Sequence, residues 1–428
     1  MRAKSFAWLA VLTGAVFFAA ALNATGKASA ETITCISYLD PQGVKALKSL
    51  TERFYKETGI RVDLINVSSS EVFTKIRVMI AGGTPPDLYA GGLYVWDLAS
   101  MGVLGDFTPF LKKENVDLKD FYGPAVKAGR YQDILYGIPY SMNTTLLSYN
   151  ADRVSEAGLV RPGKWGDDSW TWERYAIYAQ KMTKDTNSDG QPDLYGGTPY
   201  PQRLIDIPWM FGSGWVSRDL SRIIVDEPAG IRSFQFVHDL IYGLRVSPTL
   251  DRMGGIETGR VAMSSIGTWN VPTFVRSIKG FDWNIAAMPI GTSLPEDGGY
   301  AIPSYPDGFI LFDTKKKEAS WRWVKFIVFD DENLRYFATN VIHQLPPVRR
   351  LVPSYVSELI RMKPNLDLQT LLAAPDCAQI QRLFLNPNMT DILVEADKRI
   401  AAMLSNPNAN VDSEVKQMAK AIQQLWNR

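Results

Sequence analysis

The most constraining feature of the sequence is a strand, helix, strand, helix, strand pattern between residues 33 and 90. Apolar residues recur at helical spacing in two segments, and short runs rich in β-branched residues flank them. The expected strands are 33–38, 60–67 and 87–90, with one helix over 44–58 and another from about Val72 that ends before Gly82. Strands joined in this way pair in parallel with right-handed crossovers, which predicts an α/β fold.

Ligands of such sheets bind beyond the carboxyl ends of the strands. Tyr38, Asp40, Gly91, Gly92 and Tyr94 fall at those ends and are therefore candidate ligand-binding residues. A plain turn is an equally good interpretation of the glycine pair.

The first 30 residues have the organisation of a secretory signal peptide. Arg2 and Lys4 precede an apolar run from residue 6 to 22, and Ala28-Ser29-Ala30 supplies small residues for cleavage after Ala30. An uncleaved membrane anchor is the alternative, because the run is close to the length of a short spanning helix. Cleavage would change the formal net charge from +1 to −2 by removing Arg2, Lys4 and Lys27. This near-neutral charge predicts no nucleic-acid partner. We further expect the mature protein to be exported and monomeric.

The segment from Gly259 to Pro272 indicates a binding cleft. A short apolar strand stops at Gly267, and Trp269 and Asn270 follow directly. Glycine permits a tight backbone path, and an indole ring offers a broad apolar face with one N–H donor. The alternative for Trp269 is an ordinary core residue.

Four segments occur in a fixed order that, with the export signal, resembles the extracellular solute-binding proteins of family 1, which capture sugars for ABC importers. The segments are Gly83–Leu88, Tyr136–Tyr140 leading to Tyr149-Asn150, Ser169–Glu173, and Ala262–Pro272. The later segments Trp321–Phe326 and Leu345–Arg349 look like the family's late helix and turn.

The resemblance implies two α/β lobes, each a mostly parallel sheet flanked by helices, joined by hinge strands and closing around a ligand. Carried over by position, one lobe holds residues 31–141 and 289–329, and the other holds 145–286 and 331–428. The crossings would lie near Ser141–Thr145, Ala286–Pro289 and Val328–Asp331. Cys35 and Cys377 would then lie in different lobes, and we expect them to remain unpaired, because a bridge between moving lobes would lock them.

A sugar ligand needs aromatic rings for its C–H face and fixed donors and acceptors for its hydroxyl groups. The resemblance places ligand contacts near Asp40, around Ala90 to Tyr94, and at Trp269. The remaining candidates come from composition and neighbourhood, and they are Tyr38, Asn143, Trp209, Trp215, Asn270 and Tyr300. A packed aromatic cluster is an equally good interpretation of Trp209 and Trp215, and a surface turn is the alternative for Tyr300.

A possible calcium loop begins at Asp185. Asp185, Asn187, Asp189 and Asp193 supply oxygen ligands, and Gly190 stands at the sixth position of a calcium-binding loop. The twelfth position is Gly196 instead of the usual glutamate. A tight turn without an ion is therefore the alternative, and we expect no required cofactor.

Sequence motifs give little support for catalysis. His238 and His343 are the two histidines, and the chain has no nucleophile elbow, P-loop, HExxH motif or Cys/His cluster. We therefore predict a sugar-binding receptor that is not an enzyme and that delivers its ligand to an ABC permease. One alternative is a receptor for a non-sugar solute such as a phosphorylated polyol, for which Arg203 is a candidate contact. The other is a secreted carbohydrate-active enzyme with paired carboxylates.

Overall fold

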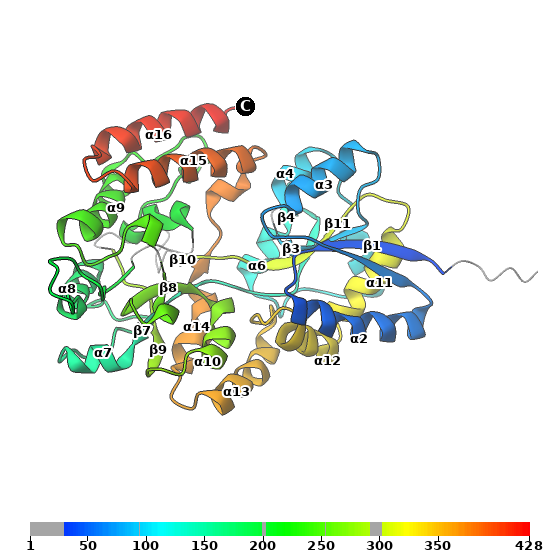
Figure 1. The fold of residues 1–428 in the computed structure, drawn as a ribbon. Helices are drawn as coiled ribbons and strands as arrows, with labels where there is room; N and C mark the ends of the chain where they lie inside the picture. Colours follow the sequence, from blue (N-terminus) through cyan, green and yellow to red (C-terminus); the bar gives the residue numbers. More distant parts are fainter. Residues whose placement is uncertain (1–29, 94, 199–202, 253, 292–301) are drawn as a thin grey trace, which may run out of the picture.

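The computed structural model describes residues 30–93, 95–198, 203–252, 254–291 and 302–428. The expected signal peptide before Ala30, Tyr94 and Tyr300 lie outside these ranges. The chain forms two α/β lobes that lie side by side (Figure 1). Within the described ranges, none of the helices combines the length and the apolar character that crossing a bilayer requires.

The first lobe is built on a five-stranded sheet in the order β2-β1-β3-β11-β6. β1 pairs in parallel with β2 and β3, whereas β11 is antiparallel to both β3 and β6. The strands are β1 (Thr32–Ser37), β2 (Arg61–Asn66), β3 (Leu88–Gly92), β6 (Gly137–Pro139) and β11 (Asp307–Leu311). The predicted strand and helix alternation up to residue 90 is confirmed, because its apolar pattern is local.

Helices cover both faces of this sheet because successive strand residues point to opposite sides. Cys35 and Phe309 face one core, whereas Ile36 and Ile310 face the other. The first core is covered by α2 (Pro41–Thr58), α5 (Thr108–Glu114), α11 (Lys317–Val328) and α12 (Asp331–Tyr336). The second is covered by α3 (Val72–Ala81) and α4 (Val95–Ser100).

The second lobe has a three-stranded sheet in the order β8-β7-β9, and both pairs are antiparallel. Its strands are β7 (Thr145–Asn150), β8 (Met263–Gly267) and β9 (Trp283–Ala286). The two-lobe α/β fold is as expected, but the mostly parallel sheet expected for this lobe is wrong. Whether two strands pair in parallel depends on how the chain connects them, and the apolar pattern of the strands does not encode that connection.

The remaining elements are shorter or surround the second sheet (Figure 1). The helices are α6 (Gly123–Ala128), α7 (Ala151–Glu156), α8 (Trp172–Met182), α9 (Pro228–His238), α10 (Val271–Ser277), α13 (Val352–Met362), α14 (Leu368–Cys377), α15 (Met389–Leu404) and α16 (Val411–Trp426). The short strands are β4 (Arg130–Tyr131), β5 (Ile134–Leu135), β10 (Ile302–Pro303) and β12 (Ala378–Gln379). Short segments of other helix types are η1 (Leu204–Phe211), η2 (Asp239–Gly243), η3 (Leu250–Arg252), η4 (Ile256–Thr258), η5 (Thr268–Asn270), η6 (Phe337–Val341), η7 (Arg349–Leu351) and η8 (Arg382–Leu385).

Two of the expected lobe boundaries differ from the observed packing. Ile302 and Tyr305 pack in the core of the second lobe, although 289–329 was assigned to the first. Leu334 and Leu351 pack in the core of the first lobe, although 331–428 was assigned to the second. An amphipathic helix such as α12 shows which of its faces is apolar but not which lobe that face will cover.

Both cysteines are free thiols, as expected. Cys35 is buried in β1, and burial raises the pKa of its thiol to about 12. Cys377 ends α14, and partial burial raises its pKa to about 11.

Candidate functional site

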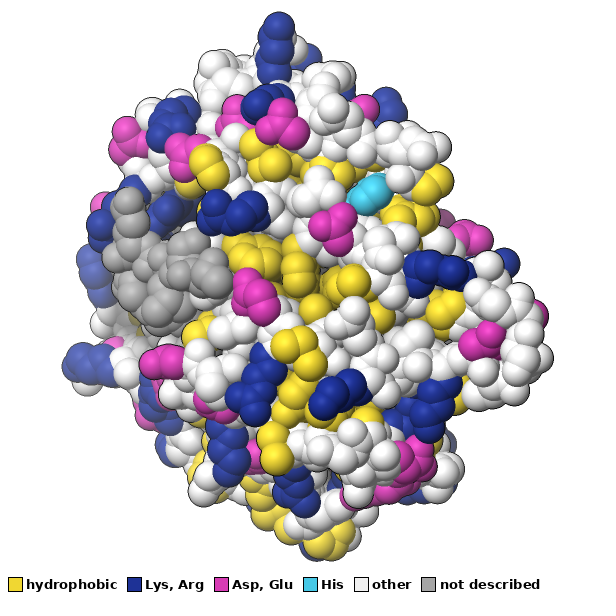
Figure 2. Space-filling view, turned by 90° about the vertical axis from the view of Figure 1, so that its left-hand side faces the viewer, with side chains coloured by type: hydrophobic (Ala, Val, Ile, Leu, Met, Phe, Trp, Pro, Cys, Tyr) yellow, Lys and Arg dark blue, Asp and Glu magenta, His cyan; other side chains and the backbone are white. Residues whose placement is uncertain are grey.

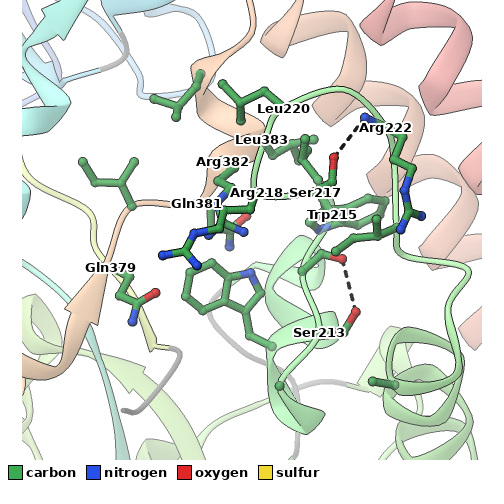
Figure 3. Close-up of a pocket in the computed structure, with 18 of the residues that line it drawn as sticks. Ser213, Trp215, Ser217, Arg218, Leu220, Arg222, Gln379, Gln381, Arg382 and Leu383 are labelled. Atoms are coloured by element: carbon green, nitrogen blue, oxygen red, sulfur yellow. Dashed lines mark hydrogen bonds between the residues drawn. The ribbon is translucent and has the colours of Figure 1, made fainter. Parts of the chain in front are cut away.

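An open cavity of about 700 Å³ lies between the lobes. The second lobe contributes residues between Trp209 and Ala229 and the segment from Ala378 to Leu385, whereas the first lobe contributes Pro124 and Lys127 of α6. Figure 3 shows Trp215, Arg218, Gln379, Gln381 and Arg382 around this space. A volume of this size is within the range of small-molecule sites, about 300–1,000 Å³.

The turn η1 carries a buried acid, Asp206, and an indole, Trp209, that lines the cavity. Residues three apart eclipse each other in a 3₁₀ helix, so Asp206 and Trp209 share one face. Gly212 ends the turn with a φ of 74°, in the left-handed region that glycine tolerates. Trp209 is partly exposed and lines the cavity, so its ring face can receive a ligand.

Trp215 lines the same cavity but belongs mainly to the core. Its side chain is 2% exposed, and its indole N–H donates to the carbonyl of Ile205 at 2.6 Å. Its ring also lies edge-on to Phe234 at 6.5 Å. The structure therefore brings the two predicted tryptophans together and gives them different environments.

A buried carboxylate lies behind the cavity wall. Asp206 is 2% exposed and accepts hydrogen bonds from the Tyr305 hydroxyl and from Nε2 of Gln381. Burial raises the pKa of Asp206 to about 7, although these two hydrogen bonds and the charge of Arg203 oppose the rise. The Arg203 guanidinium lies over the Tyr305 ring at 4.9 Å, so this candidate residue joins the same cluster.

Trp269 is connected to this cluster through Tyr305, the two rings meeting edge-on at 5.9 Å. The indole folds back over Gly267, where an added Cβ would lie 2.3 Å from Cε2 of the ring. Asn270 accepts the Gly267 N–H at 3.0 Å, which fixes this turn. Both residues are partly exposed, but neither is among the described residues that line the cavity.

A chain of hydrogen bonds crosses between the lobes and includes two further candidates. Tyr38 donates to Asp307 at 3.2 Å, and Gln344 donates to the same carboxylate at 2.9 Å. Asn143 donates to Gln344 at 2.8 Å and accepts from Thr268 at 3.3 Å. Burial raises the pKa of Asp307 to about 6. Asn143 is 1% exposed, so the structure places it within the crossing instead of in the cavity.

Asp40, Gly91 and Gly92 have local structural roles in the first lobe. Asp40 is the N-cap of α2 and accepts the Gly43 N–H at 2.7 Å. Gly91 and Gly92 are the last residues of β3, so the expected turn is wrong at this point. A Cβ at Gly91 would lie 2.6 Å from Cε1 of Tyr38, because that ring packs directly on the strand.

The candidate calcium loop closes on its own backbone. Asp185 accepts the Gly190 N–H at 2.8 Å, and Asn187 accepts the Asp189 N–H at 3.0 Å. Asp193 accepts from Thr186, so its carboxylate also takes part in the turn. No group of three or more His, Cys, Asp or Glu side chains is placed to hold a metal in the part of the chain that the structure describes. Calcium binding at these four residues stays a prediction.

Neither histidine lines the cavity. His238 is 7% exposed, and its Nε2 lies 3.0 Å from the carbonyl of Asn406. Nδ1 of His343 lies 2.7 Å from the carbonyl of Thr339. Figure 2 shows Lys and Arg side chains mixed with Asp and Glu over one face of the second lobe, without a band of one sign among its described residues.

Sequence reasoning missed Gln379, Gln381 and Arg382, which form one wall of the cavity. They follow α14, in a segment without glycine, tryptophan or tyrosine to mark it. β12 pairs with β10, and this pairing brings the segment to the site.

Comparisons with known proteins agree with this architecture. The bacterial extracellular solute-binding protein family matches residues 40–333, more than half of the chain. The galactooligosaccharide-binding protein of Bacillus subtilis is 23% identical over 279 residues, which cover 62% of this chain and 62% of that protein. The arabinooligosaccharide-binding protein of the same organism is 24% identical over 194 residues, covering 44% of this chain and 42% of that protein. The matches thus span less than two thirds of either relative.

A solved structure extends the likeness over nearly the whole chain. An ABC substrate-binding protein from Listeria monocytogenes in complex with cycloalternan superposes with a TM-score of 0.78 at 20% identity, covering 92% of this chain and 98% of that one. At this identity the likeness establishes the two-lobe fold. Together with the family match, it shows that this chain belongs to the bacterial extracellular solute-binding protein family.

Proposed function

We propose that this protein is the extracytoplasmic substrate-binding component of an ABC importer and captures a sugar or oligosaccharide between its two lobes. The observation that carries the proposal is the cavity of about 700 Å³, which residues of both lobes line. A site shared by two lobes can close around a ligand when the lobes rotate about the segments in which the chain passes from one lobe to the other.

The chemistry of the wall suits a polyhydroxylated ring. Trp209 presents an apolar face for the C–H groups of a pyranose, and Gln379 and Gln381 carry amide groups for its hydroxyls. The relatives named for galactooligosaccharides and arabinooligosaccharides support the same ligand class.

The proposed cycle has four steps, which are capture between open lobes, closure, docking on the membrane permease, and release. The permease must prefer the closed form, because equal affinity for both forms would shift no population. The receptor acts as a monomer in the periplasm or at the cell surface, and it binds its ligand without converting it.

The test is a thermal-shift screen against neutral oligosaccharides, followed by chromatography of the incubated sugars. A receptor raises the melting temperature with ligand concentration and returns every sugar unchanged. Product formation at catalytic rates would instead favour an enzyme with paired carboxylates. A screen without any response to sugars would refute the proposal.

A second candidate function is capture of a phosphorylated polyol. Among its described residues, the cavity lining includes the cationic side chains of Lys127, Arg218, Arg222 and Arg382 against one acidic side chain, that of Glu227. Arg222 pairs with Glu227 at 2.7 Å. Guanidinium groups are well suited to phosphate, so the screen includes glycerol phosphate beside glycerol. A response to the phosphorylated compound alone would favour this second candidate.

A further inference from the structure

Gln381 holds an unusual position in the cavity wall. Its side chain is 1% exposed and lines the cavity, and its Nε2 donates to Asp206. Its Oε1 is buried and accepts no hydrogen bond from any residue that the structure describes. Buried polar atoms are nearly always paired, so an unpaired acceptor at a cavity wall indicates a ligand donor.

The network behind Gln381 engages one end of its amide and leaves the other end without a partner among the described residues. Asp206 also accepts from the Tyr305 hydroxyl, and Asp206 is not among the described residues that line the cavity. The Asp206 carboxylate therefore holds the Nε2 end of the Gln381 amide toward itself. Because the amide is planar, Oε1 points away from Asp206. While Asp206 is ionised, the cavity wall therefore holds a buried acceptor that only a donor can satisfy.

We propose that Oε1 of Gln381 accepts a hydrogen bond from one hydroxyl group of the bound sugar and thereby selects for that hydroxyl. This inference rests on the proposed sugar-binding function and adds a specificity-determining residue to it. Removal of the hydroxyl leaves the buried Oε1 unpaired, which costs about ten-fold to a hundred-fold in affinity.

The experiment begins on the unchanged protein with maltotriose, mannotriose, galactotriose and arabinotriose as probes. Calorimetry identifies the tightest probe, and its monodeoxy and monodeoxyfluoro derivatives are then measured position by position. One position should lose about ten-fold to a hundred-fold with both derivatives, because fluorine keeps the size of a hydroxyl but cannot donate. If no position shows such a loss, the inference is overturned, whatever the variants do.

Two variants then assign the effect to one residue. Gln381→Met keeps the length of the side chain and removes the acceptor, and Gln379→Met makes the same change elsewhere on the same wall. Gln381→Met should bind the parent sugar as weakly as the sensitive deoxy sugar, whereas Gln379→Met should keep the difference between them.

The outcomes separate the two proposals. If none of the four sugars binds, the proposed function fails and this inference fails with it. If a sugar binds and Gln381→Met still discriminates against the sensitive deoxy derivative, the proposed function stands and the inference is overturned. A purely structural role of Gln381 would weaken the parent and all its derivatives by the same factor.

Discussion

Asp206 should make the stability of this protein fall as the pH rises from the acid range to neutrality. Its pKa is raised from 3.8 to about 7, so the folded protein retains a proton that the unfolded chain releases. The stabilisation is fully present below the unfolded pKa of 3.8, falls as the pH rises from there to the folded pKa of about 7, and changes no further above it. At about 1.36 kcal/mol per pH unit, this group lowers the free energy of unfolding by about 3 kcal/mol between pH 5 and pH 8.

The variant Asp206→Asn isolates this contribution. The new amide can still accept from Tyr305, and the Gln381 amide can turn to accept from it, so the cluster keeps its hydrogen bonds. Urea unfolding followed by tryptophan fluorescence at pH 5, 6, 7 and 8 should give the variant a flatter profile, by about 3 kcal/mol over that range. Asp307, whose pKa burial also raises, contributes equally to both proteins, whereas Asp397 interacts with the Asp206 charge and belongs to the measured difference.

A matched control is Asp219→Asn in the same lobe. Hydrogen bonds from Ser217 and Ser221 lower the pKa of this exposed carboxylate to about 2, so it does not titrate between pH 5 and pH 8. Its profile should therefore parallel that of the unchanged protein. If Asp206→Asn also gives a parallel profile, Asp206 is not a buried titrating group, and the reasoning about its cluster is wrong.

Three further predictions follow from packing and thiol chemistry. Trp215→Ala should lower the free energy of unfolding by about 3–5 kcal/mol in urea denaturation, whereas Trp209→Ala should lower it by less and mainly reduce sugar-induced stabilisation in thermal shift. Gly267→Ala should destabilise the protein by about 1–3 kcal/mol, measured in the same way, because the added Cβ meets the indole that folds over it. Cys35 and Cys377 should react slowly with a thiol reagent in the native protein, and both should react in denaturant without reductant; finding no free thiol there would indicate a disulfide between them.

The fold was largely predictable where the signal was local. Val72 and Ile76 recur at helical spacing, and α3 forms there for that reason. The lobe on which a helix packs is not encoded in its local sequence. Leu334 and Leu351 belong to a core that also contains Ile33 and Leu88, more than 200 positions earlier, and no spacing rule identifies those partners.

The candidate site was predictable only in part. The glycines around Trp209 and Trp215 suggested a loop at the site, and both residues line the cavity, although Trp215 is also packed in the core as the alternative expected. Asp206 and Gln381 are 175 positions apart, and their roles exist only in the folded cluster. Asp40 is a strand-end polar residue, but a carboxylate just before a helix can equally cap it, and the sequence does not separate these roles.

Affinity and selectivity should depend on different residues of this cavity. Stacking on Trp209 requires only a C–H face, which most pyranoses have, so it distinguishes poorly between sugars. A hydrogen bond to the fixed Oε1 of Gln381 distinguishes well, because losing it leaves a buried oxygen unpaired. Trp209→Ala should therefore weaken all four trisaccharides by a similar factor in calorimetry, whereas Gln381→Met should change their order of affinity. The same order of affinity in both variants would contradict this division.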